Sequence, residues 1–218
     1  MFVHLDGRLV EEADARISVF DRGLLYGDGV FESMRAVSGR IFRLEAHLER
    51  LERSAALAEF EGWPSPSVLA SHLRETLEAN GLRDARLRLT LTRGVGRPGD
   101  YVHAPGPPTR IITAAAFSGL EPRLYEEGVN LAVVGRQAVP PAVLDAAIKT
   151  TSRLPAVLAR REASRAGAFE AALLDAAGHL TEGTTSNIFL VEGGRLLTPA
   201  TDGTALPGVT RAVVLEAA

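Results

Sequence analysis

Lys149 is the only lysine in the chain, and the other 23 of its 24 basic residues are arginine. Genome composition explains an excess of arginine wherever a surface cation suffices, but it does not explain why one lysine was kept. Arginine cannot replace lysine where the chemistry needs a neutral primary amine, because a guanidinium is not deprotonated in a protein. Formation of a Schiff base with a carbonyl compound is one such reaction. Lys149 is therefore the first candidate for a catalytic residue.

Three short motifs could serve chemistry together with this lysine. Glu182 lies in LTEGTTSNIF (180–189), at an expected junction between a strand and a loop, and LPGVTR (206–211) is a glycine-containing turn into a helix. HLERL (47–51) places Arg50 on one helical face with three other polar side chains: Arg43, His47 and Ser54. Each motif also has an ordinary interpretation, as a surface carboxylate, the start of a helix or a solvated arginine. Taken singly, those interpretations are the better ones for all three.

Other chemical patterns are excluded by their context. GVGRPG (94–99) matches a dinucleotide-binding pattern, but the prolines that follow it up to residue 108 prevent the helix that the pattern requires. No G-x-x-x-x-G-K-[ST] phosphate loop and no G-x-S-x-G nucleophile motif occurs. The five histidines are scattered and the chain has no cysteine. We therefore expect no metal site, no disulfide and no thiol nucleophile.

The first half of the chain predicts short strands and amphipathic helices. Leu87, Leu89 and Leu91 alternate with polar residues, as expected for a half-buried strand, whereas the leucines from Leu44 onward recur at helical spacing. The same rules predict a hairpin at 4–10, strands at 30–37 and 110–116, helices at 44–59 and 66–80, and a glycine- and proline-rich loop at 94–109.

The second half is predicted to be richer in strands. Ser152 is expected to cap a helix at 153–166, and a last helix is expected to begin at residue 209. Strands are predicted at 129–135, 169–175, 186–192 and 195–197. The natural seam lies near residues 117–122. The sequence therefore predicts an α/β (α+β) protein of two domains, residues 1–117 and residues 123–218, the second of which carries Lys149.

Composition excludes several classes of function. With 23% charged residues, a net charge of −3 and no block of like charges, the chain lacks a basic footprint for nucleic acid or an acidic membrane surface. No apolar run approaches the roughly 20 residues that span a bilayer, and the first residues lack the features of a signal peptide. We therefore expect a cytoplasmic protein that binds small molecules, with no nucleic-acid or membrane partner.

Taken in order along the chain, the motifs resemble one family. DRGLLYGDGVFESMRAV (21–37), HLERL, the single lysine, TEGTTSNIF and LPGVTR are similar to the class IV (fold type IV) pyridoxal-phosphate enzymes. That family comprises branched-chain aminotransferases, D-amino-acid aminotransferases and 4-amino-4-deoxychorismate lyases. The resemblance covers the whole chain. It implies the two-domain fold type IV architecture, a homodimer, and pyridoxal 5'-phosphate bound in the cleft between the domains.

The resemblance also implies a role for each motif. Lys149 would form the Schiff base with the cofactor and move the substrate Cα proton, and Arg50 would bind the cofactor phosphate. Glu182 would keep the pyridine nitrogen protonated, because a nearby negative charge favours the cation. The remaining cofactor contacts implied in this way are Asn187, which orders the glutamate strand, Leu206, which packs on the pyridine face, and Val209 and Thr210, which offer the phosphate a helix N-terminus.

Departures from the family's patterns bear on the branch. Leu154 stands where branched-chain enzymes have tyrosine, so the chain resembles the lyase and D-amino-acid branches more closely. Arg97 lies near the arginine with which the D-amino-acid branch holds the substrate carboxylate, although the matching histidine is missing. Tyr26 and Phe31 are expected to line the substrate pocket. The chain also stops some tens of residues earlier than family members usually do, before a further phosphate loop.

The sequence thus predicts amino-group transfer between an amino acid and a 2-oxo acid. The first alternative is 4-amino-4-deoxychorismate lyase, which forms 4-aminobenzoate and pyruvate in the folate pathway. The second is a truncated relative that binds the cofactor without turnover, although the retention of both Lys149 and Glu182 argues against it. The substrate, its chirality and the size of the oligomer are not determined by the sequence.

Overall fold

The computed structural model describes residues 1–102 and 106–218, so part of the predicted loop at 94–109 lies outside the described residues. The chain forms two compact units. Unit 1 comprises Met1–Gly119 together with Lys149–Ser152, and unit 2 comprises Leu120–Ile148 and Arg153–Ala218. The segment that carries the lysine thus folds with the first unit, whereas the sequence assigned it to the second domain.

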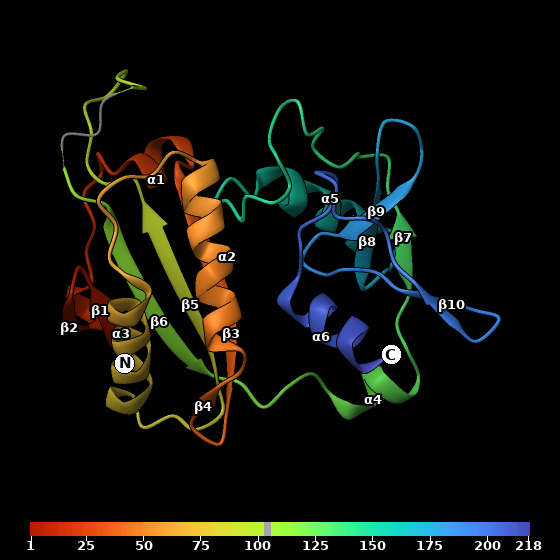
Figure 1. Ribbon diagram of the computed structural model, residues 1–218, viewed down its shortest axis with the longest axis horizontal. Helices are drawn as coiled ribbons and strands as arrows, with labels where there is room; N and C mark the ends of the chain where they lie inside the picture. Colours follow the sequence, from red (N-terminus) through yellow and green to blue (C-terminus); the bar gives the residue numbers. More distant parts are fainter. Residues whose placement is uncertain (103–105) are drawn as a thin grey trace. The chain divides into compact units, whose positions relative to one another are not determined.

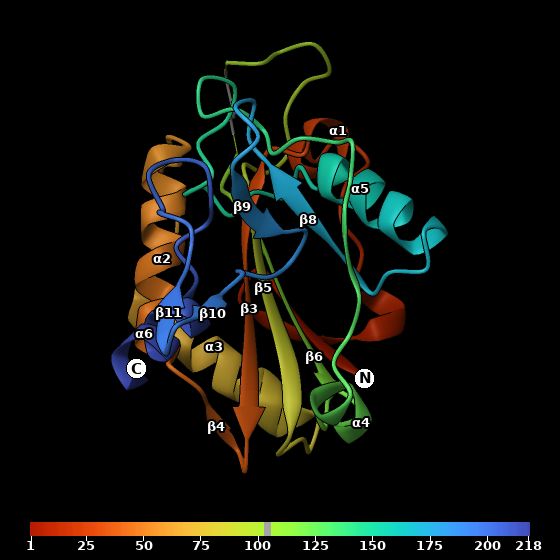
Figure 2. The same ribbon diagram turned by 90° about the vertical axis from the view of Figure 1, so that its right-hand side faces the viewer.

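Unit 1 is built on an antiparallel six-stranded sheet in the order β2-β1-β6-β5-β3-β4. The strands are β1 (Phe2–Leu5), β2 (Arg8–Glu11), β3 (Gly29–Val37), β4 (Arg40–Ile41), β5 (Ala85–Thr92) and β6 (Thr109–Ala116). A 3-10 turn η1 (Glu12–Asp14) and three helices complete the unit: α1 (Arg22–Tyr26), α2 (Leu44–Leu57) and α3 (Pro66–Ala79). Helices α2 and α3 cover the same face of the sheet in both views (Figures 1 and 2).

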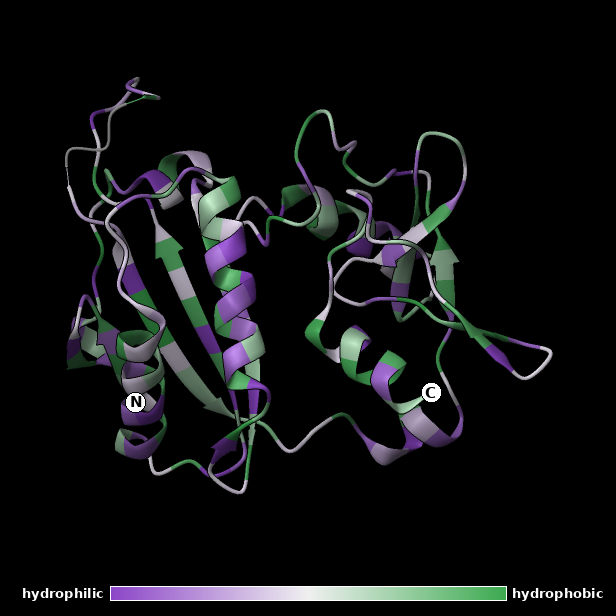
Figure 3. Ribbon diagram, in the orientation of Figure 1, coloured by the Kyte–Doolittle hydropathy of each residue, from purple (hydrophilic) through white to green (hydrophobic). Residues whose placement is uncertain are grey.

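The alternation predicted for β5 is confirmed. Leu87, Leu89 and Leu91 are fully buried, while Arg88 and Thr90 between them are half-buried on the opposite face. Figure 3 shows the corresponding alternation of hydrophobic and hydrophilic residues along this strand. Further fully buried side chains of the core come from the two covering helices and from β6: Leu51, Leu69, Leu73 and Ile112. Burial of each such side chain contributes about 1.5–3 kcal/mol relative to exposure.

Unit 2 is a smaller sheet with one packed helix. Strands β7 (Leu131–Val133), β8 (Glu170–Leu174) and β9 (Leu180–Gly183) lie in that order, and β10 (Leu190–Glu192) pairs with β11 (Arg195–Leu197) in a separate hairpin. Strand β7 pairs parallel with β8, so the chain must cross over between them, and α5 (Leu154–Arg165) lies in that connection. The core contains five buried residues: Val134, Ala159, Ala163, Ala171 and Leu173. Helices α4 (Pro122–Glu126) and α6 (Val209–Ala217) complete the unit.

Most predicted elements are confirmed, with local exceptions. The strand expected at 186–192 is only β10, at its end, and four short elements were missed: η1, α1, β4 and α4. The residue that caps α5 is Arg153, without a side-chain cap, whereas Ser152 donates its hydroxyl to the Gly27 carbonyl 3.1 Å away. Among the described residues, no helix is both long and apolar enough to cross a membrane. Within those same residues, no cluster of three or more side chains could hold a metal ion.

Candidate active site

The segment around Lys149 is attached to the edge of β3. The Phe31 amide donates to the Lys149 carbonyl over 2.9 Å, and the Thr151 amide donates to the Gly29 carbonyl over 2.8 Å. The Lys149 amide in turn donates to the Ser54 hydroxyl of α2 over 3.1 Å. Three hydrogen bonds therefore fix the backbone on both sides of the lysine, which restricts where its amine can reach.

The ring of Phe31 lies beside two cations. The Lys149 Nζ is 4.9 Å from the ring centroid, and the guanidinium carbon of Arg88 is 3.8 Å from it. Both distances are within the range of cation–π attraction. Sequence reasoning found Phe31 and Lys149 but missed Arg88. The available signal was the alternation along β5, which places Arg88 opposite the buried leucines, but only the β3–β5 register brings it diagonally next to Phe31.

Arg50 is buried in an ion pair that the sequence did not indicate. Its Nε donates to Glu32 Oε1 over 2.7 Å, and its Nη2 donates to Glu32 Oε2 over 2.8 Å. His47 Nδ1 lies 2.7 Å from the same Oε2. Burial raises the pKa of Glu32, but the hydrogen bonds from His47 and Arg50 outweigh it and hold the pKa below its ordinary value. Two residues of the predicted polar face of α2, His47 and Arg50, therefore contact Glu32 of β3. This carboxylate holds the guanidinium plane of Arg50 in one orientation.

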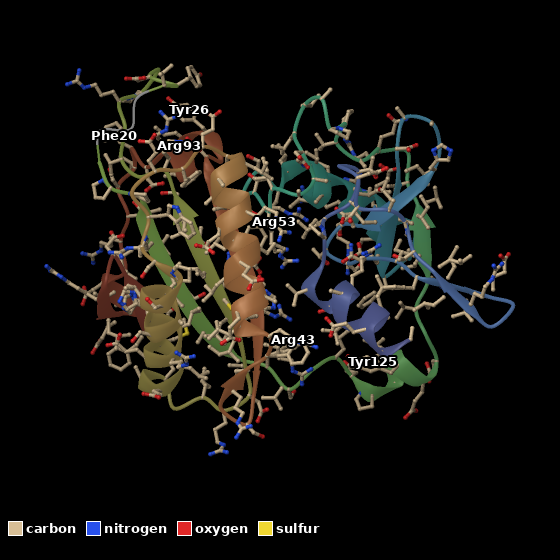
Figure 4. The ribbon with its side chains drawn as sticks, viewed as in Figure 1. Phe20, Tyr26, Arg43, Arg53, Arg93 and Tyr125 are labelled. Carbon is tan, nitrogen blue, oxygen red and sulfur yellow. The ribbon has the colours of Figure 1, made fainter. Side chains whose placement is uncertain are left out.

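The two other predicted substrate residues of unit 1 belong to a different part of its surface. The Tyr26 hydroxyl accepts a hydrogen bond from the Gly99 amide over 2.8 Å, and its ring lies 4.9 Å from that of Tyr101. Arg97 is exposed in the same loop, where its carbonyl accepts the Asp100 amide over 3.1 Å. Figure 4 labels Tyr26 beside this loop. Tyr26 thus holds the loop in place, and its role in lining the substrate pocket stays a prediction.

Unit 2 brings the remaining predicted residues together. Glu182 Oε2 accepts the Leu206 amide over 2.9 Å, and the Asn187 side-chain amide donates to the Leu206 carbonyl, also over 2.9 Å. Three residues after Leu206, α6 begins at Val209, which is buried, followed by the exposed Thr210. A Cβ on Gly208 would lie only 2.0 Å from Asn187 Oδ1, so this contact requires glycine. Both polar ends of the TEGTTSN loop are therefore tied to the residues that start α6.

A buried carboxylate that the sequence analysis missed organises the middle of that loop. Glu170 of β8 accepts the Thr184 hydroxyl over 2.6 Å and the Thr185 hydroxyl over 3.2 Å, and it pairs with Arg160 Nη1 over 2.8 Å. Burial raises the pKa of Glu170, but the hydrogen bonds from the Thr184 hydroxyl and the Ala171 amide, together with Arg160, hold this pKa below its ordinary value. Glu170 stands in an apolar strand sequence, FEAALL, and a charged residue at such a position was the signal available.

The sequence model of the family described as amino-transferase class IV matches residues 29–218. The chain belongs to this enzyme family. A Methanocaldococcus jannaschii protein that is provisionally named a branched-chain-amino-acid aminotransferase is 42% identical over 218 residues, covering 100% of this chain and 75% of its own.

Solved structures of the family share the fold. The branched-chain amino acid aminotransferase of Escherichia coli has a TM-score of 0.93 and 29% identity, covering 99% of this chain and 73% of that one. A further branched-chain enzyme, solved in complex with N-(5'-phosphopyridoxyl)-L-glutamate, has a TM-score of 0.91 and 28% identity, covering 99% and 72%. The 4-amino-4-deoxychorismate lyase of Pseudomonas aeruginosa has a TM-score of 0.84 and 35% identity, covering 99% and 76%. Similarity of sequence and structure thus extends to both branches, and it does not single out the lyase and D-amino-acid branches that Leu154 favoured.

Proposed function

We propose that this enzyme is a pyridoxal-phosphate-dependent aminotransferase that transfers an amino group between an amino acid and a 2-oxo acid. The observation that carries the proposal is the position of Lys149. The only lysine of the chain lies on a segment held to β3 by backbone hydrogen bonds, with its amine 4.9 Å from the centroid of the Phe31 ring, which Arg88 also contacts. The relative crystallised with a phosphopyridoxyl amino acid supports the choice of cofactor.

The side chains of the two units fit the parts of pyridoxal phosphate in type and charge. An aldehyde requires an amine, which Lys149 supplies, and a pyridine nitrogen requires a carboxylate, which Glu182 supplies. A phosphate suits the N-terminus of α6, because Gly208 offers it no side-chain cap. In the first turn of this helix, the buried Nε of Arg211 has no hydrogen-bond partner among the described residues. Arg50, held by Glu32, is the proposed second cation for the phosphate.

When bound, the cofactor supplies an electron sink for the pair of electrons left at the substrate Cα. The chain's own residues supply the rest. The Lys149 amine would hold the cofactor and, once displaced by substrate, would take the proton from the substrate Cα and deliver it to the carbon that carried the cofactor's aldehyde. Glu182, fixed by the Leu206 amide, would place a negative charge against the pyridine nitrogen. Arg88 would attract a substrate carboxylate, and the buried Phe31 ring would exclude water beside the amine.

The proposed substrates are amino acids with apolar side chains, as in the branched-chain relatives. The second candidate is 4-amino-4-deoxychorismate lyase, and Leu154 is the observation that favours it, because branched-chain enzymes have tyrosine there. The side chain of Leu154 is 66% exposed at the start of α5. A homodimer, a cytoplasmic location and the substrate roles of Tyr26 and Arg97 remain predictions.

The test is an assay of the purified chain with added pyridoxal phosphate. We expect 2-oxoglutarate to be converted to glutamate when a branched-chain L-amino acid is the donor, and D-alanine is the matched donor of opposite chirality. Release of 4-aminobenzoate and pyruvate from aminodeoxychorismate, without any transfer, would establish the lyase instead. Cofactor binding without either reaction would establish the non-catalytic alternative.

Replacing the lysine tests the proposed role directly. Lys149→Arg keeps the positive charge but loses the amine, so turnover is expected to fall about 10²–10⁴-fold or further. Borohydride treatment followed by peptide mass spectrometry should attach the cofactor to Lys149 in the wild type and to no residue in the variant. Arg161→Lys, an exposed exchange on α5, is the control and should change neither result. Cofactor recovered on another residue would contradict the assignment.

A further inference from the structure

The loop after β5 is docked against α1 by backbone hydrogen bonds. The Arg22 amide donates to the Gly94 carbonyl over 2.9 Å, and the Gly96 amide donates to the Phe20 carbonyl over 3.1 Å. Phe20 and Tyr26 lie at the same end of unit 1 in Figure 4. The prolines and glycines of this segment predicted a loop, and its first residues are hydrogen-bonded to Phe20 and Arg22.

Side chains of α1 hold the next three residues of the loop. The buried Arg22 donates from Nη1 to the Asp100 carbonyl over 2.5 Å and from Nη2 to the Tyr101 carbonyl over 2.9 Å. The Gly99 amide donates to the Tyr26 hydroxyl. A Cβ on Gly96 would lie 3.1 Å from the stem of Arg22, so glycine allows the arginine to pass beneath the loop. The path of the chain from Gly99 to Tyr101 is thus set by the side chains of Arg22 and Tyr26.

The hydrogen bonds of Arg22 and Tyr26 to residues 99–101 form a clamp on the loop, and Asp28 connects this clamp to the end of α2. Its Oδ2 accepts Nε of Arg22 and Nε of Arg93, each over 2.9 Å. Arg93 also donates to the carbonyls of Ala58 and Glu59, over 2.6 and 2.7 Å, where α2 has just ended. One carboxylate therefore orients two guanidinium groups, of which one binds loop carbonyls and the other binds helix-end carbonyls.

The same turn touches the lysine segment on its other side. The Gly27 carbonyl accepts the Thr151 hydroxyl over 2.8 Å, and the Gly29 carbonyl accepts the Thr151 amide. A Cβ on Gly29 would lie 2.8 Å from the Thr151 hydroxyl oxygen, and Gly27 has a φ of +67°, so both positions favour glycine. The Gly-Asp-Gly turn at 27–29 thus joins the loop clamp to the segment of Lys149.

We propose that Arg22 and Asp28 are positioning residues that set the Arg97-bearing loop relative to the lysine segment, and so control substrate affinity. This inference rests on the proposed function for its kinetic consequence. Arg22 satisfies three acceptors from one planar group, which a lysine cannot do. Loss of the clamp should release the loop while leaving Lys149 on β3, because the hydrogen bonds of residues 149 and 151 to β3 do not involve Arg22.

The experiment compares Arg22→Lys, Asp28→Asn and Tyr26→Phe with the wild type. Asp14→Asn is the control, because Asp14 is an exposed carboxylate whose nearest guanidinium is 4.0 Å away. Amide hydrogen exchange of residues 96–101 is measured first, since it requires neither cofactor nor turnover. We expect at least tenfold faster exchange in the first two variants, a smaller increase in Tyr26→Phe at Gly99, and no change in the control.

Steady-state kinetics of the holoenzyme form the second arm. Arg22→Lys and Asp28→Asn should raise KM for the amino acid about tenfold or more, with kcat changed by less than about threefold. Unchanged amide exchange of residues 96–101 in all three variants would show that these side chains do not hold the loop. Faster exchange with an unchanged KM would show that holding the loop does not control substrate affinity. If Arg22→Lys does not fold, Tyr26→Phe still decides the first arm, because it removes only one acceptor. An inactive wild type would contradict the proposed function alone, since exchange still reports on the clamp.

Discussion

Among the described residues each unit contains one buried glutamate, and the two are satisfied in different ways. Glu32 in unit 1 is fully buried between His47 and Arg50, both on α2. Glu170 in unit 2 is satisfied chiefly by hydroxyls of the loop that follows β9, with Arg160 as its half-exposed ion-pair partner. The first therefore joins a helix to a strand, whereas the second shapes a loop. The comparison indicates that Glu32 depends on charge pairing and Glu170 chiefly on local hydrogen bonding.

Removal of the charge on Glu32 is the largest effect that we expect. Glu32→Gln leaves the buried Arg50 without its counter-ion, and breaking a buried ion pair on one side costs about 3–5 kcal/mol. The free energy of unfolding in urea, measured with the apoprotein, checks this value. Glu49→Gln, at an exposed position of the same helix, is the matched control and should change stability by less than about 0.5 kcal/mol. A Glu32→Gln effect as small as the control's would show that the pair contributes little.

The two units should lose stability at different pH values when the protein is acidified. In unit 1 burial lowers the pKa of His4, as does the stacked His72, and burial likewise lowers that of His72. A histidine with a lowered pKa takes up protons more readily when unfolded, so its stabilisation is complete above about pH 6.5 and is lost as the pH falls further. The lowered pKa values of Glu32 and Glu170 act in the same direction, but only below their ordinary value of 4.5.

As the pH falls, we therefore expect the stability of unit 1 to decrease first, between about pH 6.5 and 4.5. The stability of both units should decrease at lower pH. Hydrogen exchange of β5 and β8 amides, corrected for intrinsic rates at each pH, reports the two units separately. His72→Gln should reduce the early loss in β5 and leave β8 unchanged. The expected order would be contradicted if β5 and β8 lost their protection against exchange together, and only below the ordinary pKa of a glutamate.

Glu170→Gln should have a moderate effect that is confined to its loop. The amide keeps one acceptor oxygen but loses the charge-assisted bonds, so we expect a loss of about 1–3 kcal/mol in the free energy of unfolding. Faster exchange of the amides at 183–186 should accompany it. Glu162→Gln, on the neighbouring α5, is the control, and its amide exchange at 183–186 should equal that of the wild type. A change that spreads to β5 would contradict the local role of Glu170.

The smallest expected effect is that of a single loop hydroxyl. Thr185→Val removes one donor at 3.2 Å from Glu170 and keeps the shape of the side chain, which should cost about 0.5–1.5 kcal/mol. Thr184→Val, whose hydroxyl lies at 2.6 Å and is buried, should cost more. Thermal unfolding of the two variants side by side checks the ranking. Equal effects would show that the loop hydroxyls are interchangeable.

Local patterns were sufficient to predict the elements that carry the site. Leucines at helical spacing predicted α2 within two residues of its observed end, and alternation predicted the buried face of β5. The chemical distinction between lysine and arginine singled out Lys149, because an amine and a guanidinium differ wherever a proton must be lost. These inferences succeed because each depends only on residues close together in the sequence or on the chemistry of one side chain.

Tertiary structure alone decided which side chains meet. Glu32 and Arg50 are 18 positions apart, and their pairing depends on how α2 lies on β3. The attachment of residues 149–152 to unit 1 depends on hydrogen bonds to residues 27–31, more than a hundred positions earlier. Arg88 reaches Phe31 only through the register of β3 and β5, and a shift by one residue would turn it to the opposite face of the sheet. No local pattern encodes these distances, since helix placement and strand register are set by packing of the whole core.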